Sequence, residues 1–315
     1  MVRVMIIDVH YHLVAKEWYP EGWWATVARM YVHGLKAVLG IDMSLEEVSQ
    51  RLIPPLWDPE GETLIRDMDT AGVDKTVILP IDYWALFGEP NVSLDGQHKA
   101  YAELQRKHPE RIIAFATVDP RRPDAVEIVE RAITEWGLRG LDLYPQTGFF
   151  PNQRETYRVL EKACELGVPV LCHTGEQDPP PFHAKYGNPI YLDDVAVDFP
   201  NLTVIAGAMA FGWHQQLFYL ATLKYNLATD ISAWQDVAKL HYSLFCHVLR
   251  QGLNRMGSDR ILFGTDNPFV AAFMSTEEYV NLIKELPQKA PDGTKFTEEE
   301  VAAILGENAA RILSV

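Results

Sequence analysis

Residues 4–12 read VMIIDVHYH, a short and mostly apolar run with several β-branched residues that ends in two histidines. Such a run is typical of a strand that is buried on both faces in a parallel sheet. Seven comparable runs follow along the chain, and amphipathic stretches separate them. The eight predicted strands are residues 4–8, 75–79, 112–117, 140–143, 168–172, 202–206, 226–231 and 260–264.

The stretches between these runs have the apolar spacing of helices, for example residues 63–71, 123–136, 154–166 and 242–256. Several end next to a glycine, where a helix C-cap belongs. Eight strand–helix units in series predict an α/β fold, the (β/α)8 TIM barrel. A doubly wound open sheet is the alternative, but no GxGxxG follows the first run. Because such barrels often exceed 200 residues, we expect one domain over residues 1–315.

One segment, about residues 14–58, is much longer than the usual loop after a barrel strand and is predicted to be an insertion. Its aromatic residues favour either a lid over a planar or apolar substrate, or a small core or subunit interface of its own. They are Trp18, Tyr19, Trp23, Trp24, Tyr31 and Trp57. The residues expected to contact substrate, from this segment and from strand ends, are Trp24, Arg51, Trp84, Tyr144 and Trp213. Lys185 is, with Arg51, a candidate cation for an anionic substrate.

Composition excludes several classes of protein. With 28 Lys and Arg against 43 Asp and Glu, the net charge of -15 disfavours nucleic acid and anionic membranes as partners. No apolar run approaches the roughly 20 residues that span a bilayer, and no signal peptide is evident, so we expect a cytoplasmic protein. The three cysteines form no CxxC motif, and we expect no disulfide.

The pair His10 and His12 is the first candidate for chemistry. Residues two apart on a strand share a face, so both imidazoles can project toward the barrel mouth and form half of a metal site. His173 and Asp266 follow the fifth and eighth predicted strands, at the end where TIM-barrel active sites lie. Three imidazoles and a carboxylate suit one divalent ion, Zn²⁺ first and Mn²⁺ or Fe²⁺ as alternatives. Asp8 is a candidate hydrogen-bond partner of a ligand histidine.

Further motifs extend this pattern along the chain: GLDLYP at 140–145, PVLCHTG at 169–175, ILFGTDNP at 261–268 and ILGENAAR at 304–311. Together with residues 7–12 they make the chain resemble the metal-dependent amidohydrolase superfamily. The most similar branch includes aminocarboxymuconate semialdehyde decarboxylase, resorcylate-type decarboxylases and small-ring hydrolases. The resemblance implies that His10, His12, His173 and Asp266 bind one catalytic metal, and that Asp266 transfers a proton.

The resemblance carries further expectations. Binuclear members use a carboxylated lysine after the fourth strand, where this chain has Tyr144 and Pro145, which favours a single metal. The family also implies a small-molecule substrate, and aromatic insertions in this branch commonly lie at interfaces, which favours a homodimer or a higher homo-oligomer.

The chain departs from the family pattern after the sixth strand, where Ala208 stands in place of a histidine that polarises substrate or moves a proton. Three explanations stay open. His214 or His183 replaces the missing imidazole, the chemistry dispenses with it, or the histidine was replaced deliberately and the protein is inactive.

The sequence therefore favours a hydrolase of a small cyclic or aromatic amide or ester, in which metal-activated water attacks a carbonyl. The alternative is a non-oxidative decarboxylase of a small aromatic or unsaturated carboxylic acid on the same metal site. A further alternative is a catalytically inactive variant or ligand-binding barrel, because of Ala208. The fold itself does not choose among them.

Overall fold

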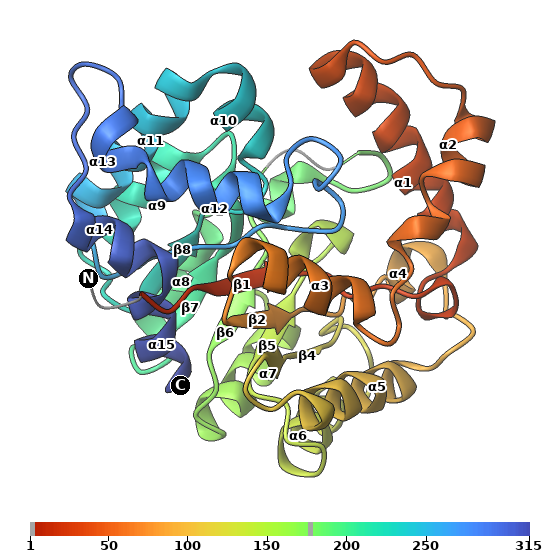
Figure 1. The fold of residues 1–315 in the computed structure, drawn as a ribbon. Helices are drawn as coiled ribbons and strands as arrows, with labels where there is room; N and C mark the ends of the chain where they lie inside the picture. Colours follow the sequence, from red (N-terminus) through yellow and green to blue (C-terminus); the bar gives the residue numbers. More distant parts are fainter. Residues whose placement is uncertain (1–3, 176–178) are drawn as a thin grey trace.

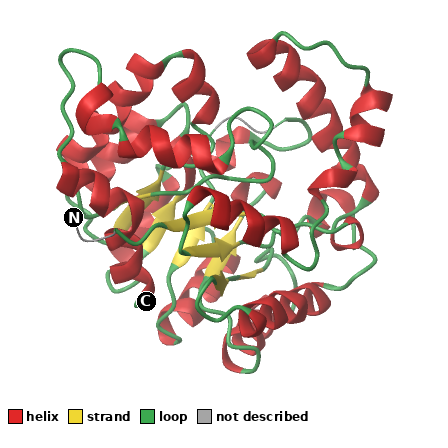
Figure 2. Ribbon diagram, viewed as in Figure 1, coloured by secondary structure: helices red, strands yellow, loops and turns green. Residues whose placement is uncertain are grey.

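A computed structural model describes residues 4–175 and 179–315 of the chain. In this part of the chain, parallel strands lie at the centre and helices surround them (Figure 2). The strands are β1 (Ile7–Tyr11), β2 (Lys75–Ile78), β3 (Ile112–Ala114), β4 (Ala116–Thr117), β5 (Leu141–Leu143), β6 (Val170–Cys172), β7 (Val204–Ala206), β8 (Leu227–Asp230) and β9 (Ile261–Leu262). Each predicted strand corresponds to one of these elements, except that residues 112–117 are divided into β3 and β4 at Phe115.

The strands pair in chain order, β1 to β3 in one sheet and β4 to β9 in the other, and hydrogen bonds join the two sheets at both seams. At the first, the Phe115 amide donates to the Ile78 carbonyl over 3.1 Å. At the second, the Val9 amide donates to the Phe263 carbonyl over 2.9 Å, and Tyr11 pairs in parallel with Asn267. The described strands therefore close into a barrel, and the predicted TIM-barrel fold is confirmed.

The α-helices of the described residues lie outside the strands (Figure 1). Helix α11 has the predicted bounds, and α3, α6 and α7 differ from prediction by one or two residues at their ends. The helices are α1 (Glu21–Gly34), α2 (Leu45–Arg51), α3 (Glu62–Ala71), α4 (Trp84–Phe87), α5 (Leu94–Lys107), α6 (Ala125–Thr134), α7 (Arg154–Glu165), α8 (Tyr191–Asp198), α9 (His214–Ala221), α10 (Gln235–Leu240), α11 (Tyr242–Met256), α12 (Thr276–Lys284), α13 (Leu286–Lys289), α14 (Glu298–Ala302) and α15 (Asn308–Leu313).

One end of the barrel is filled by apolar side chains. Val9, Phe115 and Leu171, from three different strand regions, belong to one buried cluster with Ala309 and Leu313 of α15. Because α15 packs against this end, the opposite end, where the strands finish, is left for a site.

Between β1 and α3 the chain forms α1 and α2, together with the short helices η1 (Lys16–Trp18), η2 (Leu35–Leu39) and η3 (Pro54–Leu56). Helix α1 lies beyond the end of β1 (Figure 1). Trp23 contacts both Tyr19 and Trp24, with ring centroids 4.6 Å apart in each pair, and all three are buried. The segment therefore has an aromatic core of its own, which agrees with one of the two interpretations of its aromatic residues.

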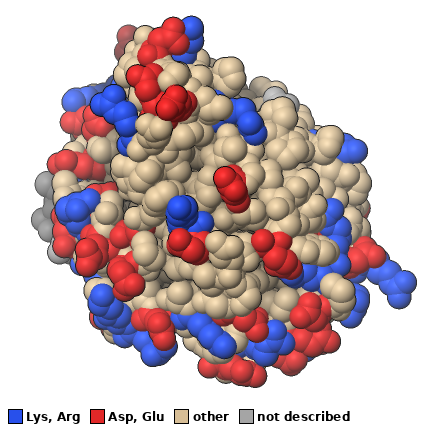
Figure 3. Space-filling model, turned by 90° about the vertical axis from the view of Figure 1, so that its right-hand side faces the viewer, with Lys and Arg blue, Asp and Glu red and all other residues tan. Residues whose placement is uncertain are grey.

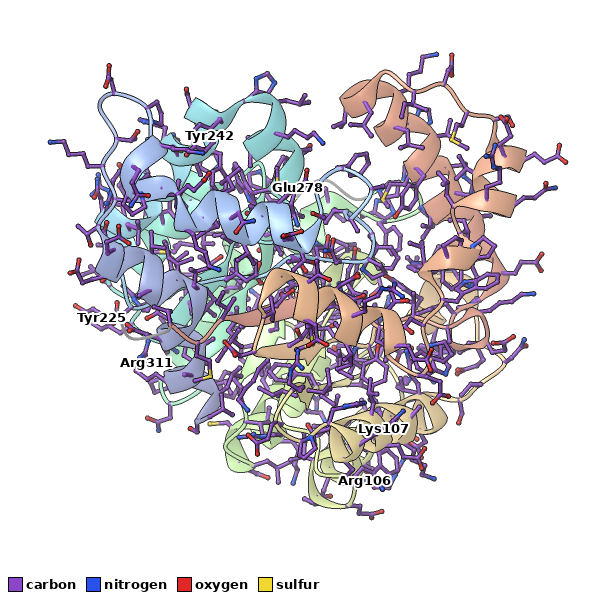
Figure 4. The ribbon with its side chains drawn as sticks, viewed as in Figure 1. Arg106, Lys107, Tyr225, Tyr242, Glu278 and Arg311 are labelled. Carbon is purple, nitrogen blue, oxygen red and sulfur yellow. The ribbon has the colours of Figure 1, made fainter. Side chains whose placement is uncertain are left out.

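Charged side chains lie mostly at the periphery. Arg106 and Lys107, at the end of α5, and Arg311, on α15, lie on the outside of the molecule (Figure 4). Among the described residues, no helix combines the length and the apolar character needed to cross a bilayer. Cys164, Cys172 and Cys246 all carry free thiols, as expected.

Candidate active site

The irregular geometry of β1 brings His10, within the strand, and His12, just after it, into the barrel mouth. The strand lies three residues later than predicted, and its pairing with β2 shifts register between Asp8 and Tyr11. Ile7 and Val9 face the apolar interior of the barrel. A shift of this kind re-aims the side chains that follow it, which is a common feature next to active sites. His10 therefore faces the same interior as Val9, although strict alternation would place neighbouring residues on opposite faces.

His10, His12, His173 and Asp266 converge at this end of the barrel. The Nε2 atoms of His10 and His12 are 3.2 Å apart. Asp266 Oδ1 lies 3.1 Å from His12 Nε2 and 3.6 Å from His10 Nε2. The potential ligand atoms of the three histidines all lie within 4.8 Å of one another. The structure therefore brings together the four residues expected to hold a metal.

The outer nitrogen of each imidazole faces an acceptor. His10 Nδ1 lies 3.0 Å from Asp230 Oδ2, and His12 Nδ1 lies 3.0 Å from the Leu79 carbonyl oxygen. His173 Nε2 lies 3.3 Å from Asp142 Oδ1, without the alignment of a full hydrogen bond. A carboxylate or carbonyl behind a histidine fixes the ring orientation and its tautomer, as is usual for metal ligands. Sequence reasoning did not identify these roles of Asp230, Asp142 and Leu79.

This arrangement fits a cation. Because Nδ1 of His10 and of His12 each donates its proton outward, their Nε2 lone pairs face one another and the Asp266 carboxylate. Acceptor atoms this close repel one another unless a proton or a metal ion lies between them. Burial lowers the pKa of His10, but Asp230, Asp266 and Asp142 raise it more, to about 9. The same negative surroundings favour a divalent ion, and the nitrogen and oxygen donors suit Zn²⁺ or Mn²⁺.

Backbone contacts hold the two ligand segments together. The Asp266 amide donates to the His10 carbonyl over 2.7 Å, and Asp266 has a φ of 62°, which aspartate tolerates better than most residues. A Cβ atom at Gly264 would lie 2.9 Å from the Cβ of His10, so a glycine is required there.

Asp8 supports the backbone and contacts neither ligand ring. Its Oδ1 accepts hydrogen bonds from the amides of His10 and Thr265, both over 3.0 Å, and its Oδ2 accepts one from Thr265 Oγ1 over 2.6 Å. Burial raises the pKa of Asp8 to about 7. Asp8 was expected to support a ligand histidine, but its carboxylate accepts from the backbone amide of His10 and not from the imidazole. The register shift in β1 separates the face of Asp8 from that of the His10 ring.

Ala208 lies in a left-handed turn beside the site. It has a φ of 55°, its amide donates to Asp230 Oδ1 over 2.9 Å, and its carbonyl accepts from Trp234 Nε1 over 2.7 Å. Ala208 lines the cavity that contains the converging histidines. The position expected for the missing histidine is therefore next to the site.

His214 and His183 do not replace that histidine. The ring of His214 packs against Trp234, with 5.7 Å between ring centroids, and lies outside the cavity lining. His183 is exposed beside Tyr186 and also lies outside the lining. The proposed substitution by either residue was wrong, because both side chains point to other parts of the molecule.

The cavity has a volume of about 740 Å³, and aromatic side chains surround its inner part. Tyr144 lies closest to the ligand set among those expected, with its ring centroid 4.5 Å from that of His173. Trp23, Tyr83, Phe182 and Phe269 also line it. This environment suits a flat, largely apolar ligand.

The other residues expected to contact substrate do not line the cavity: Trp24, Arg51, Trp84, Trp213 and Lys185. The Nε1 atom of Trp24 donates to the Lys16 carbonyl over 3.0 Å, and its neighbour Trp23 faces the cavity instead. Arg51 and Lys185 are exposed on the surface. These predictions were wrong because a position near a strand end or in the expected lid does not fix the direction of a side chain. The side chains of these residues face away from the cavity. Glu176, which follows the fifth predicted strand and is a weaker candidate for contact with substrate, lies outside the described residues.

Arg29, on α1, is the one lysine or arginine among the described residues that line the cavity. Sequence reasoning missed it, because six residues on a helix turn through about 600° and do not place Arg29 directly on the face of Trp23.

Comparison with known proteins places this site in context. A model of the protein family described as Amidohydrolase matches residues 7–315. The chain is 23% identical to the 2-amino-3-carboxymuconate-6-semialdehyde decarboxylase of Dictyostelium discoideum, over 99% of this chain and 92% of the relative.

Solved structures share the fold. The 5-carboxyvanillate decarboxylase of Novosphingobium aromaticivorans, crystallised with manganese and 4-hydroxy-3-methoxy-5-nitrobenzoic acid, matches with a TM-score of 0.68 and 16% identity, over 99% of this chain and 96% of that one. A protein from Acinetobacter baumannii named as a probable 2-pyrone-4,6-dicarboxylic acid hydrolase, with citric acid bound, matches with a TM-score of 0.62 and 14% identity, over 98% and 99% of the two chains.

Proposed function

The chain belongs to the amidohydrolase family, and from that premise we propose that this enzyme is a metal-dependent, non-oxidative decarboxylase of a small aromatic or unsaturated carboxylic acid. The observation that carries the proposal is a set of three buried histidines, His10, His12 and His173, next to the partly exposed Asp266 in an aromatic cavity. The chain also matches a decarboxylase over 92% of the length of that relative. The hydrolase that the sequence favoured becomes the second candidate, because decarboxylases predominate among the related proteins.

His10, His12 and His173 would hold the metal through the nitrogens that face the cavity, with Asp266 as the fourth ligand. A bound divalent ion supplies positive charge for the carboxylate of the substrate and an adjacent oxygen. Zn²⁺ is the ion expected from the donor set, and Mn²⁺ is the first alternative to load, because a related decarboxylase was crystallised with manganese.

Asp266 is the proposed proton donor. Its side chain is 23% exposed, toward the cavity, whereas His10 and His12 are buried. During decarboxylation the bond between the carboxylate carbon and the substrate carbon breaks, CO₂ leaves, and that substrate carbon takes a proton. A group that transfers a proton in this way contributes about 10²- to 10⁴-fold to the rate.

The aromatic side chains orient the substrate. Tyr144, beside His173, and Trp23, beside Phe269, offer faces and edges against which a planar ring can stack. Ala208 leaves space beside Asp230 instead of a second proton-transfer group, so the proposal gives this role to Asp266 alone.

The test is a product assay on metal-loaded protein. 5-Carboxyvanillate, 2-amino-3-carboxymuconate-6-semialdehyde and 2-pyrone-4,6-dicarboxylate would each be incubated with the Zn²⁺ and Mn²⁺ forms, with CO₂ and ring-opened acid measured in parallel. Release of CO₂ that is lost in Asp266→Asn supports the proposal. Ring-opened acid without CO₂ would favour the hydrolase. This alternative is kept because one of the similar solved structures is named as a probable hydrolase.

A further inference from the structure

The cavity continues well beyond the metal ligands along one face of α1 and η2. The residues that these two helices contribute cover one broad side of the helices, and the apolar ones at its centre recur every three or four positions. They include Trp23, Val27, Met30, Gly34, Ala37 and Val38. We call the space beside these residues the α1 groove.

The inner end of the α1 groove reaches the metal ligands. The Trp23 ring lies 5.4 Å from that of Phe269, which in turn lies 5.6 Å from the imidazole of His12. From Trp23 to Val38 the helical rise gives a length of roughly 22 Å. A single ring with its carboxylate covers only a fraction of that length. The cavity volume of about 740 Å³ likewise belongs to the size range of pockets for larger ligands.

The walls of the groove are held in place. Tyr31, on α1, donates a hydrogen bond to the Phe269 carbonyl over 2.8 Å. A Cβ atom at Gly34 would lie 2.8 Å from Cζ of Phe273, so this ring packs directly on the helix backbone. The loop that follows Asp266 and helix α1 therefore form one connected wall, and the groove exists without a ligand to shape it.

The groove is mainly apolar. Apart from the metal-binding set, the ionisable side chains among its described lining residues are Tyr31, Tyr83, Tyr144, Arg29, His33 and Asp236. Arg29 and His33 are exposed, so they lie at its rim. On the face of the molecule that carries α1, tan areas without Lys, Arg, Asp or Glu lie between scattered charged side chains (Figure 3). An apolar occupant would gain from leaving water here, and a highly charged one would not.

We propose that the α1 groove binds an apolar substituent of the substrate. The substrate class is then a carboxylic acid whose head group lies at the metal ligands and whose alkyl chain or second ring extends along α1. Only the position of the head group rests on the proposed function, because the length and character of the groove are independent of the reaction. Continuity between the groove and the ligand set favours this occupant over a second copy of the chain.

The test measures how binding depends on chain length. Benzoate, 4-butylbenzoate and 4-octylbenzoate would be titrated into metal-loaded protein by calorimetry. Affinity should rise with each added methylene, by roughly fourfold while the chain remains inside the groove.

Two matched variants locate the effect on α1. Ala37→Trp fills the outer end of the groove, whereas Ala25→Trp makes the same change at an exposed residue of α1 outside the cavity lining. Ala37→Trp should remove most of the extra affinity of 4-octylbenzoate over benzoate and leave the affinity for benzoate unchanged. Ala25→Trp should leave all three affinities unchanged.

Equal affinity for benzoate and 4-octylbenzoate would overturn the inference, as would equal effects of the two tryptophan variants. CO₂ assays on the same acids separate this result from the proposed function. If affinity rises with chain length but no substrate releases CO₂, the decarboxylase proposal is rejected and the assignment of the groove is retained. If CO₂ is released but affinity does not depend on chain length, the assignment of the groove is rejected and the decarboxylase proposal is retained. If light scattering shows that Ala37→Trp breaks an oligomer while chain length has no effect, a second copy occupies the groove and the inference fails.

Discussion

At the scale of single residues, Asp230 fixes the orientation of the His10 imidazole. It is fully buried, and besides facing His10 it accepts hydrogen bonds from the amides of Ala208 and Ser232. A buried carboxylate in this position fixes the ring of His10 and strengthens its lone pair.

Asp230→Asn should therefore weaken metal binding by about 10- to 100-fold while the fold is retained. The matched control is Asp236→Asn, since Asp236 also lines the cavity but bonds to the Val237 amide rather than to a histidine. Competition with a fluorescent zinc chelator gives both affinities. Native affinity in Asp230→Asn would remove its assigned role.

Ala208→His tests whether the chain lacks an essential group. Histidine tolerates the left-handed backbone of this position better than most residues, and the side chain would project from the cavity lining. If Asp266 alone serves as proton donor, kcat should change by less than about tenfold, which is below the usual contribution of a proton-transfer group. A steady-state assay in which the variant gained a hundredfold or more would show that the native chain is an impaired enzyme.

The sequence allowed prediction that four side chains meet at one end of the barrel, because His10 and His12 are two apart and His173 and Asp266 each follow a predicted strand. That these side chains bind a metal stays a prediction. It did not reveal the partners behind the histidines. Asp230 and Asp142 are acids on the strands themselves, and only the closed barrel brings them behind the imidazoles.

At the scale of elements, α5 is tied to the barrel through a buried histidine. His98 Nε2 accepts a hydrogen bond from the Thr117 amide over 3.0 Å, so the ring must be neutral at this nitrogen. Burial lowers the pKa of His98 to about 4, although Asp95 and Asp82 oppose the change.

This shift predicts a loss of stability in acid. In the unfolded chain His98 binds a proton below its ordinary pKa of about 6.5, whereas in the folded chain it does so only below about pH 4. The free energy of unfolding therefore falls as the pH drops from 6.5 to 4. Above pH 6.5 this group does not change it. The contribution is about 3 kcal/mol, and His98→Gln, whose amide oxygen can still accept from Thr117, should reduce the acid loss by that order. Urea unfolding of both proteins at pH 7 and pH 4.5 measures it. Identical acid losses would contradict the assignment.

The bounds of the strands after the first, and of the four helices whose bounds were predicted, followed within about two residues from apolar spacing and glycine positions, and α11 matches its prediction. The first strand lies later than predicted, because a register shift in β1 has no sequence signal in a mostly apolar run that does not alternate. The direction of the side chains of α1 was also not predictable. Trp23 and Trp24 are adjacent, so the sequence does not show which of them faces the cavity, and only the packing shows that it is Trp23.

At the scale of the whole molecule, the barrel was predictable because eight similar units recur and parallel strands must be covered on both faces. The reaction was less predictable, since hydrolysis and decarboxylation use the same ligands on the same fold. The hydrolase preference was revised on the evidence of relatives.

Removal of the metal should lower the stability of the entire barrel. Without a cation the Nε2 atoms of His10 and His12 and the Asp266 carboxylate face one another, and an ion held at about 100 times its Kd would add about 2.7 kcal/mol. Dialysis against EDTA is expected to lower the Tm by about 5 °C, and restored Zn²⁺ or Mn²⁺ should recover it. A Tm that stays constant while mass spectrometry shows the metal gone would argue against a site of this kind.

The most direct test of the central assignment is a crystal structure of the manganese-loaded protein, with anomalous scattering measured above and below the metal edge. We expect one strong anomalous peak per chain, within about 2.3 Å of His10 Nε2, His12 Nε2, a nitrogen of His173 and an oxygen of Asp266. A peak bound by other residues, or no peak at these four atoms in saturating manganese, would contradict the assignment.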